Sequence, residues 1–433
     1  MRRHPLLQSF ARSVAAGAIL CLAAVGPALA FDAEALAARF KTLGVKVSNE
    51  EATPQTVVKM TYVSLPWEIR VHDEDIALMA GLPKLQSLDL GGRRELTPAI
   101  IPFLAEMPAL QRLSLNSLHI GDEGAAQLGQ MTGLRDLSLS SARGLSPTGI
   151  AALAKSRSIR RLKLFDVTVG DEGLAALATM PQLEDLQLTR ARGVTPAGLR
   201  ELAKLTKLRK LDIAETWADD SVLEAFANHA SLDSLRLNKI DTITDAGLAA
   251  IGTLPRLKEL TLDETLIDGS GLPDLAKAVS LENLSMQKTL ISDETVKGLG
   301  TFPVLTKLSV ADTRAGDGVA AQIGALKTLE TLFINDTELS DEGFKAIATL
   351  PEIQFLQLSD TQVSDAGLSA IVMPKLMTLD ISGTGASLAT LEQLVNHERL
   401  RSVSMRKLDL KKADVDPVLA KRDPDKKKLS VYN

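Results

Sequence analysis

Cysteine is almost absent from this sequence: its 433 residues contain one, Cys21, within an apolar N-terminal stretch. The remainder of the chain therefore has no disulfide, no cysteine nucleophile and no cysteine-ligated metal. Aromatic residues make up 3% of the chain, so an aromatic side chain on a surface is informative. The net charge of -5 shows no excess of basic residues, and we expect no nucleic-acid partner.

The first thirty residues have the order of a cleavable signal peptide. Arg2 and Arg3 form a basic start, residues 14–25 are apolar, and small residues precede Phe31. Cleavage near Ala30 predicts a periplasmic or secreted protein. The apolar run is shorter than the roughly 20 residues that cross a bilayer, so no stable membrane span is expected. An uncleaved anchor and a twin-arginine export route are the alternatives.

A single pattern, L-x-x-L-x-L, recurs along the rest of the chain at steps of 23 to 25 residues. Its first apolar positions are Leu85, Leu110, Leu134, Ile159, Leu183, Leu208, Leu232, Leu257, Leu281, Leu305, Leu329, Ile353, Leu376 and Leu400. A degenerate copy precedes them, with Val57, Met60 and Tyr62 assigned to the three apolar positions. Self-similarity at this period predicts a solenoid, in which each repeat buries its apolar flanks against its neighbours.

Each repeat reads as a short strand followed by a short helix. The alternation in L-x-x-L-x-L predicts the strand. Ser340 and Ser364 stand at N-cap positions, followed by Asp341 and Asp365, which suit the positive end of a helix dipole. Pro98, Pro147 and Pro196 occupy the same position in other repeats, where proline loses only an amide that is unpaired anyway.

Threonine recurs in the turn that leaves the strand. It occupies this position at Thr265, Thr289, Thr313, Thr337, Thr361 and Thr384. A hydroxyl there is expected to satisfy backbone groups of the turn. Earlier repeats carry apolar residues instead, such as Leu118 and Val167.

The extended pattern L-x-x-L-x-L-x-x-T-x-[IV]-[ST]-D-x-G-L resembles the leucine-rich repeat in its bacterial form. The resemblance covers nearly all of the chain after residue 30. It implies an α/β fold: a ribonuclease-inhibitor-like solenoid with a curved parallel sheet on the concave side and short helices on the convex side. The family most often serves as a protein-interaction scaffold.

The predicted organisation has four parts: a signal peptide at 1–30, an N-terminal cap with a degenerate first repeat at 31–84, the repeat array at 85–405, and a C-terminal cap at 406–433. Leu36, Phe40 and Leu43 form an apolar stripe on a predicted helix over residues 32–43. Leu429 and Val431 are expected in a last edge strand.

The open face of the sheet is the expected binding surface. It is formed by the third and fifth letters of each L-x-x-L-x-L, and of these 28 positions in the fourteen regular repeats all but two are polar or charged. The exceptions, Phe333 and Phe355, lie one diagonal apart on adjacent strands, where aromatic rings can meet. An aromatic pair in a polar sheet indicates a binding anchor. Alternatively, the rings shield only each other, or the C-terminal cap covers them.

Further residues are assigned to the same surface. Thr331, Gln357, Met377 and Asp380 are expected around the phenylalanine pair, and Arg112, Arg161 and Lys163 are expected to orient the ligand. Met377 stands at the start of its strand, which makes its placement the least direct.

Two other features have a ligand interpretation. Asp312, Asp336 and Asp360 recur in consecutive repeats and predict a stack of carboxylates, which is a solvated rim, a calcium site or a surface that attracts a cationic partner. Trp217 lies in a loop, as a rim contact or packed on a neighbour.

No catalytic arrangement is found in the sequence. The four histidines outside the N-terminal segment are scattered over distant repeats, and the many Asp-x-Gly segments are helix starts. We therefore expect an exported, non-catalytic scaffold that needs no cofactor or metal and binds a protein or peptide on its concave face. The alternatives are a secreted effector acting on host or neighbouring cells, and a cell-wall or carbohydrate binder.

Overall fold

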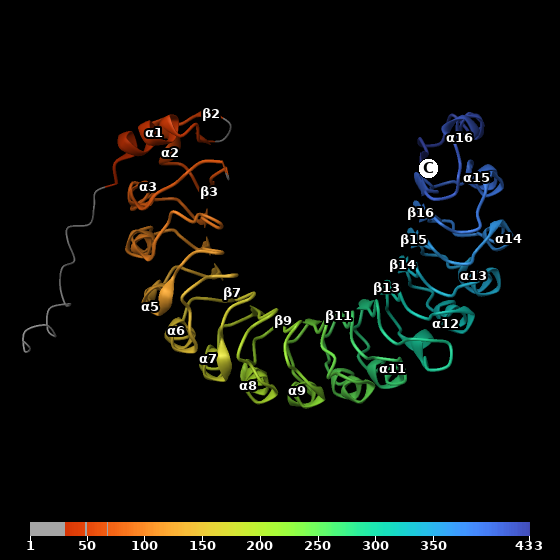
Figure 1. The fold of residues 1–433 in the computed structure, drawn as a ribbon, viewed down its shortest axis with the longest axis horizontal. Helices are drawn as coiled ribbons and strands as arrows, with labels where there is room; N and C mark the ends of the chain where they lie inside the picture. Colours follow the sequence, from red (N-terminus) through yellow and green to blue (C-terminus); the bar gives the residue numbers. More distant parts are fainter. Residues whose placement is uncertain (1–30, 48–49, 67) are drawn as a thin grey trace, which may run out of the picture.

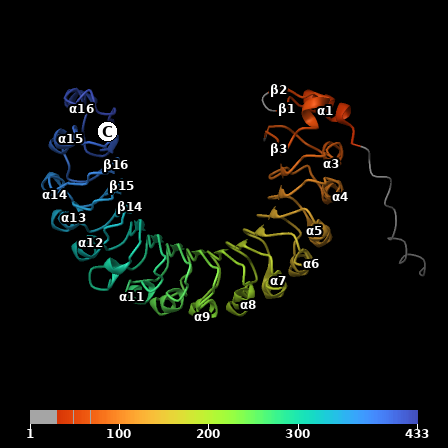
Figure 2. The same ribbon diagram turned by 180° about the vertical axis from the view of Figure 1, so that it is seen from behind.

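The structure is a computed structural model that describes residues 31–47, 50–66 and 68–433. The predicted signal peptide lies outside the described residues. The described chain forms an arc, with one continuous sheet along the inner side and helices along the outer side (Figures 1 and 2). The N-terminal helix and the C-terminal helix lie at opposite tips of this arc.

The inner sheet has sixteen strands, and each is hydrogen-bonded to its neighbours in sequence order from β3 to β18. All of these pairings are parallel, as predicted for a solenoid sheet. The strands are β3 Tyr62–Ser64, β4 Ser87–Asp89, β5 Arg112–Ser114, β6 Asp136–Ser138, β7 Arg161–Lys163, β8 Asp185–Gln187, β9 Lys210–Asp212, β10 Ser234–Arg236, β11 Glu259–Thr261, β12 Asn283–Ser285, β13 Lys307–Ser309, β14 Thr331–Phe333, β15 Phe355–Gln357, β16 Thr378–Asp380, β17 Ser402–Ser404 and β18 Ser430–Tyr432. A separate antiparallel pair, β1 Lys46–Val47 and β2 Glu50–Glu51, lies at the N-terminal tip.

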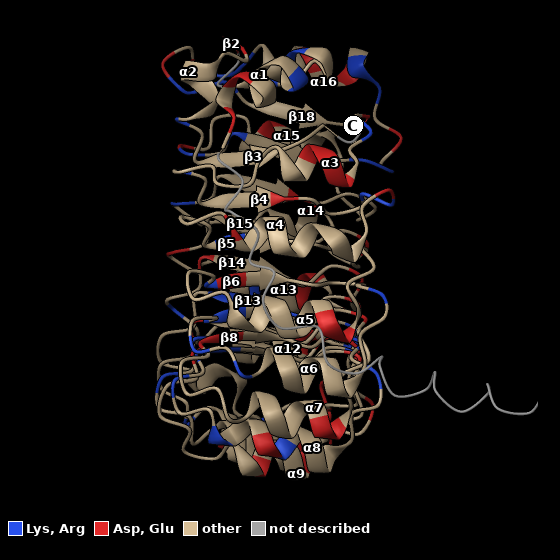
Figure 3. Ribbon diagram, turned by 90° about the vertical axis from the view of Figure 1, so that its left-hand side faces the viewer, with Lys and Arg blue, Asp and Glu red and all other residues tan. Residues whose placement is uncertain are grey.

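The convex side carries short helices. They are α1 Ala33–Thr42, α2 Pro54–Val57, α3 Asp73–Ala77, α4 Ile101–Ala105, α5 Gly121–Gln130, α6 Pro147–Leu153, α7 Gly170–Leu177, α8 Pro196–Glu201, α9 Asp220–Ala225, α10 Leu248–Ile251, α11 Leu272–Leu275, α12 Asp317–Ile323, α13 Asp341–Ile347, α14 Asp365–Leu368, α15 Leu388–Leu394 and α16 Lys412–Leu419, with 3-10 turns η1 Pro98–Ile100, η2 Leu202–Lys204, η3 Asp245–Gly247 and η4 Leu299–Thr301. Acidic residues lie in the first turns of α3, α5 and α7 on this side (Figure 3).

The core is a single apolar layer between the sheet and the helices. In β14, for example, the central Leu332 is fully buried, whereas Thr331 and Phe333 on either side of it are half-buried and face the concave side. The same alternation repeats in the other strands of the array because side chains in a strand point to opposite faces in turn. The strand register therefore fixes which side chains face a ligand.

The N-cap serines behave as predicted, and they also join adjacent repeats. The Ser340 hydroxyl accepts from the amide of Glu342 and donates to the carboxylate of Asp317 in the preceding repeat. Asp341 in turn accepts from the backbone amide and the hydroxyl of Ser364, at 2.6 and 2.7 Å. The aspartates thus form a ladder of charge-assisted hydrogen bonds along the convex side.

Aspartate and proline are consequently not interchangeable at the helix start. Asp171 accepts from the amide and hydroxyl of Thr195, whereas Pro147 in the preceding repeat has no side-chain acceptor to offer. Instead, the ring of Pro147 packs on Gly170, which has a φ of 64° and where a Cβ atom would lie 2.7 Å from the proline ring. This contact belongs to the one pair of repeats, because Gly121 after Pro98 has no neighbour within 4 Å of an added Cβ atom and Asp219 follows Pro196.

The threonine prediction is confirmed. In each of the six predicted repeats, the hydroxyl donates to a carbonyl oxygen three residues earlier, as in Thr337 to Ile334 at 2.8 Å and Thr361 to Leu358 at 2.7 Å. Leu118 and Val167 fill the corresponding space with buried apolar side chains in the earlier repeats.

The assignment of the first repeat was wrong in register. Tyr62 pairs with Ser87 and Val63 with Leu88, so the apolar positions are Met60, Val63 and Leu65 rather than Val57, Met60 and Tyr62. Tyr62 faces the concave side and is 59% exposed. The predicted N-terminal helix is present as α1, with Asp32 as its N-cap.

The predicted C-terminal edge strand is confirmed as β18, which pairs Val431 with Val403 of β17. The polar segment before it contains α16, whose buried Val415 and Val418 pack on the last repeat. Because α16 contacts α15 on the convex side, it leaves the concave face at β14 and β15 uncovered.

Candidate functional site

The two phenylalanines meet on the concave face, as the diagonal spacing predicted. Phe333 lies opposite Gln357, and Phe355 lies opposite Thr331. The ring centroids of Phe333 and Phe355 are 5.2 Å apart, with the ring planes tilted by 42°. Both rings are half-buried because each covers part of the other, yet no element of the described chain lies over them. The pair is a preformed apolar platform on a polar sheet.

A lysine extends this platform on one side. The ammonium group of Lys307, on β13, lies 5.6 Å from the centroid of the Phe333 ring, which is within the range of a cation-π interaction. The Phe333 ring also covers Ser309, which is 2% exposed and directly opposite it in the register. Lys307 is itself exposed, so its charge remains available to a ligand.

The surrounding residues differ in how directly they face the platform. Thr331 and Gln357 flank the rings on the same strands, and Asp380 lies opposite Gln357 on β16. Met377 lies one residue before β16 and is half-buried, while Thr378 takes the position opposite Phe355. Thr378 is therefore a concave neighbour of the pair that sequence reasoning did not single out.

The three basic residues predicted to orient a ligand lie far from the phenylalanines, on β5 and β7. They border a hollow of about 370 Å³ that extends from Tyr62 to β8. Arg161 is already engaged, since its Nε and Nη2 atoms donate to both carboxylate oxygens of Asp136 at 2.8 and 2.7 Å. Arg112 and Lys163 are exposed, and within the described chain neither forms a salt bridge within 4 Å.

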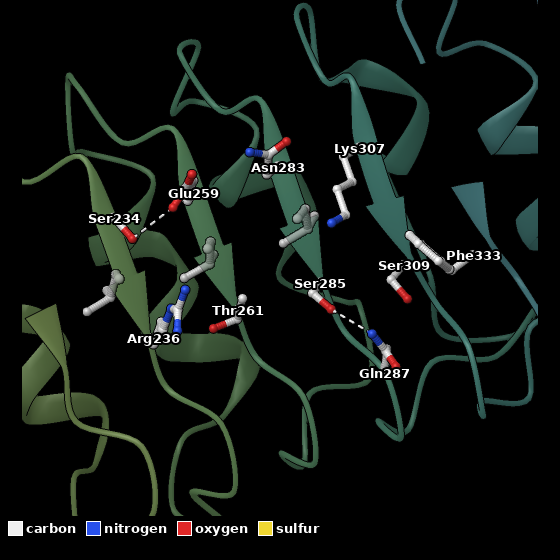
Figure 4. A pocket seen from close by; sticks show the side chains of 13 residues that line it. Ser234, Arg236, Glu259, Thr261, Asn283, Ser285, Gln287, Lys307, Ser309 and Phe333 are labelled. Atoms are coloured by element: carbon white, nitrogen blue, oxygen red, sulfur yellow. Dashed lines mark hydrogen bonds between the residues drawn. The ribbon is translucent and has the colours of Figure 1, made fainter. Parts of the chain in front are cut away.

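A second hollow connects the middle of the sheet with the phenylalanine platform. It measures about 310 Å³ and is lined by β10 to β14, from Arg236 at one end to Lys307 and Phe333 at the other (Figure 4). Glu259 lies between the two cations and accepts from the hydroxyl of Ser234 at 3.1 Å. We call this feature the central hollow.

The central hollow contains hydroxyl groups without acceptors. The Oγ atom of Ser309 and the Oγ1 atom of Thr261 are buried, and neither has a hydrogen-bond partner in the described structure. Buried polar atoms of a folded protein are nearly always paired, so each unpaired one requires an explanation. Both oxygens lie beneath the surface of the hollow, so they belong to its floor and not to the groups that a ligand would contact.

The acidic stack at the rim belongs to the turns that leave the strands. Residues there adopt a left-handed conformation, with φ between 53° and 58° from Asp166 to Asp360. Their charges alternate along most of the arc and form weak ion pairs, such as Arg190 with Glu215 at 3.4 Å. Asp312 faces Lys288 at 3.9 Å, so this run is the acidic end of a mixed ladder.

Lys407 forms an ion pair with Asp360 at the acidic end of that ladder, and a glycine lies in the turn between them. Its ammonium group lies 2.9 and 2.8 Å from the two carboxylate oxygens of Asp360, two repeats away. Gly383 occupies the intervening turn with a φ of 66°, and a Cβ atom there would lie 2.3 Å from the Asp360 carboxylate. In residues 31–47, 50–66 and 68–433, no group of three His, Cys, Asp or Glu side chains is arranged to hold a metal ion.

Two of the histidines are structural. His229 and His397 occupy equivalent positions of distant repeats, and their Nε2 atoms donate to the carbonyl oxygens of Leu205 and Met373 at 3.1 and 3.0 Å. The Nδ1 atom of each is buried without a partner in the described chain. Burial lowers the pKa of both rings.

Sequence reasoning missed two further aromatic residues of the concave face. Tyr62 and Tyr432 lie on the terminal strands β3 and β18 and are 59% and 49% exposed. Arg406 lies over the Tyr432 ring at 5.9 Å. Trp217 is 74% exposed in a turn and therefore lies outside the strand positions that build the concave face.

The comparisons with known proteins agree with this architecture. The family model described as "Leucine Rich repeat" matches residues 155–178 and 352–372, which contain β7 with α7 and β15 with α14. A leucine-rich-repeat protein of Leptospira interrogans has a similar fold, with a TM-score of 0.55 and 19% identity over 89% of this chain and 97% of that one.

The chain has the leucine-rich-repeat fold.

Other solved structures share the fold. The mouse RP105/MD-1 complex matches with a TM-score of 0.55 and 19% identity, over 78% of this chain and 58% of that chain. The TLR13-ssRNA13 complex matches with a TM-score of 0.53 and 16% identity, over 88% of this chain and 58% of that chain. The protein thus spans less than two thirds of these two chains. No curated protein matches its sequence. Among the described residues, no helix is long and apolar enough to cross a membrane.

Proposed function

We propose that this leucine-rich-repeat protein is an exported, non-catalytic scaffold that binds a protein or peptide on its concave face, with Phe333 and Phe355 as the anchor. The observation that carries the proposal is the ring pair, with centroids 5.2 Å apart, in a sheet whose other concave-facing positions from β4 to β17 are polar. Apolar side chains that are half-buried, preformed and uncovered are typical of the residues that dominate interface energetics. Export rests on the sequence of residues 1–30.

The arrangement of the platform favours a ligand over simple shielding. If the rings served only to cover each other, isolated polar residues would do as well there, as they do at the other concave-facing positions of β4 to β17. The platform borders the central hollow, and Lys307 links the two. An apolar side chain of a ligand on the rings and polar groups in the hollow would use both features.

Affinity capture tests this proposal. The exported form is immobilised and exposed to native cell envelope, beside a Phe333→Ser, Phe355→Ser double variant and a Trp217→Ser control that removes an exposed aromatic away from the concave face. Circular dichroism first establishes that all three are folded. We expect one partner to be retained by the parent and the Trp217→Ser control and lost by the double variant. Equal retention by all three would exclude the phenylalanine anchor.

A further inference from the structure

The central hollow is bordered by two cations that lack carboxylate partners. Arg236 and Lys307 are exposed, and among the described residues neither forms a salt bridge within 4 Å, although Asp212 and Glu259 lie on the strands beside Arg236. The exposed charges that remain unpaired in this hollow are therefore positive, and they favour an acidic ligand.

The spacing of these groups sets a length. Arg236 lies on β10 and Lys307 on β13, three strand intervals apart, which is roughly 14 Å across the sheet at about 4.8 Å each. Lys307 is in register with Ser234, so the two cations are also offset by two residues along the strand direction, roughly 7 Å, a gap that their long side chains can span. The platform begins one interval beyond Lys307 and ends at two, roughly 5 to 10 Å further along the sheet. The two cations and the platform thus follow one another from strand to strand, with Arg236 and Lys307 in the two different rows of the concave face (Figure 4).

An extended peptide that crosses the strands has a matching period. Its residues rise about 3.3 Å each, and alternate side chains face the sheet. Four residues span roughly 13 Å, and two more add roughly 7 Å. Because both counts are even, the side chains of residues i, i+4 and i+6 all face the sheet. Acidic residues at positions i and i+4 would reach Arg236 and Lys307, and an apolar residue at i+6 would reach the rings.

We infer that the central hollow and the phenylalanine platform together bind an extended acidic peptide segment of a partner protein, with two carboxylates four residues apart and an apolar side chain two residues further on. Glu259 faces the residue midway between the two acids and favours a hydrogen-bond donor there. This inference rests on the proposed function, since it assigns the chemistry of the ligand at the same surface.

Synthetic peptides test the inference directly. The probe is fluorescein-labelled GESTSESLG, whose binding to the exported form of the full chain is measured by fluorescence anisotropy. GQSTSQSLG removes both charges, and GESTESSLG keeps the composition and net charge but moves one acid by a single position. We expect GESTSESLG to bind more tightly than either control, because each exposed ion pair contributes roughly two- to five-fold.

Protein variants assign the effect to the two cations. Lys307→Gln and Arg236→Gln each remove one of the two expected ion pairs, so each should reduce the ratio of the affinities for GESTSESLG and GQSTSQSLG. Lys327→Gln, at an exposed lysine after α12, should leave that ratio unchanged. The advantage is also expected to shrink with added salt. Since all three positions are exposed, none of these changes removes a core contact.

The outcomes separate this inference from the proposed function. Equal affinity for GESTSESLG and either control, or no binding of any peptide, overturns the acidic ligand. A twelve-residue oligouridylate that displaces GESTSESLG at lower concentration than the unlabelled peptide overturns it as well and assigns the cations to a nucleic acid. The proposed function is tested separately. The peptide GESTSESSG, which replaces the leucine by serine, and the Phe333→Ser, Phe355→Ser variant are both expected to weaken binding whatever the acids contribute.

Discussion

The convex aspartate ladder makes a quantitative prediction at Asp365. This carboxylate accepts from the amide and the hydroxyl of Ser387 at 2.8 and 2.6 Å, and from the hydroxyl of Thr390. Thr390 is 1% exposed, so its hydroxyl finds no water if the carboxylate is removed. Hydrogen bonds to a charged group contribute about 1.5 to 3 kcal/mol, and a buried unpaired hydroxyl costs about 1 to 3 kcal/mol. After allowance for the half-exposed position of Asp365, we expect Asp365→Ala to lower the free energy of unfolding by about 3 kcal/mol.

Urea unfolding followed by circular dichroism measures this loss. The stability of a solenoid is approximately a sum of repeat and interface contributions, so the loss arises where α14 meets α15. Asp365→Asn retains one acceptor oxygen and is expected to lie between the parent and Asp365→Ala. Asp416→Ala, at an exposed acid of α16, is the control and should change the free energy of unfolding by less than about 0.5 kcal/mol. If Asp365→Ala behaves like this control, the ladder does not hold the repeats together.

Three further predictions concern titration and backbone conformation. Burial lowers the pKa of His229 and His397, so the unfolded chain takes up protons first as the pH falls below about 6.5. The free energy of unfolding should therefore decrease from pH 7 to pH 5, and unfolding curves recorded over this range should show that slope. Replacing both histidines by glutamine should flatten that slope, and an unchanged slope would assign it to other groups. Gly383→Ala should destabilise the protein by about 1 to 2 kcal/mol, because the left-handed φ of 66° disfavours a Cβ atom. That atom would also collide with the carboxylate of Asp360, which binds Lys407. A melting temperature equal to that of the parent would contradict this prediction.

The repeat register was readable from the sequence because apolar spacing and side-chain alternation are local properties. The period placed the strands from β4 to β17, and it placed Phe333 and Phe355 on one face, one diagonal apart. The serine caps were equally local, since a hydroxyl accepts from an amide two residues away. Where the first repeat is degenerate, the spacing gives two registers, and only pairing with β4 decides that Tyr62 faces the ligand side.

Contacts between repeats were beyond sequence reasoning. Asp341 and Ser364 are 23 residues apart, and nothing in the spacing shows that the carboxylate accepts from the next cap rather than only facing its own helix dipole. The same holds for the central hollow, which is built from five strands, and for Lys407, which reaches Asp360 across two repeats. A repeat pattern defines the surface, whereas long side chains that cross repeats define its chemistry.

Site-specific photo-crosslinking tests whether the concave face at β14 and β15 binds the partner. p-Benzoylphenylalanine is placed in cells either at Thr331, beside the phenylalanine platform, or at Lys345 in α13 on the convex side. If the partner binds at the platform, a covalent adduct with one partner protein forms from position 331 and none from position 345. An adduct from position 345 alone would place the partner on the convex side and exclude the platform as its binding site.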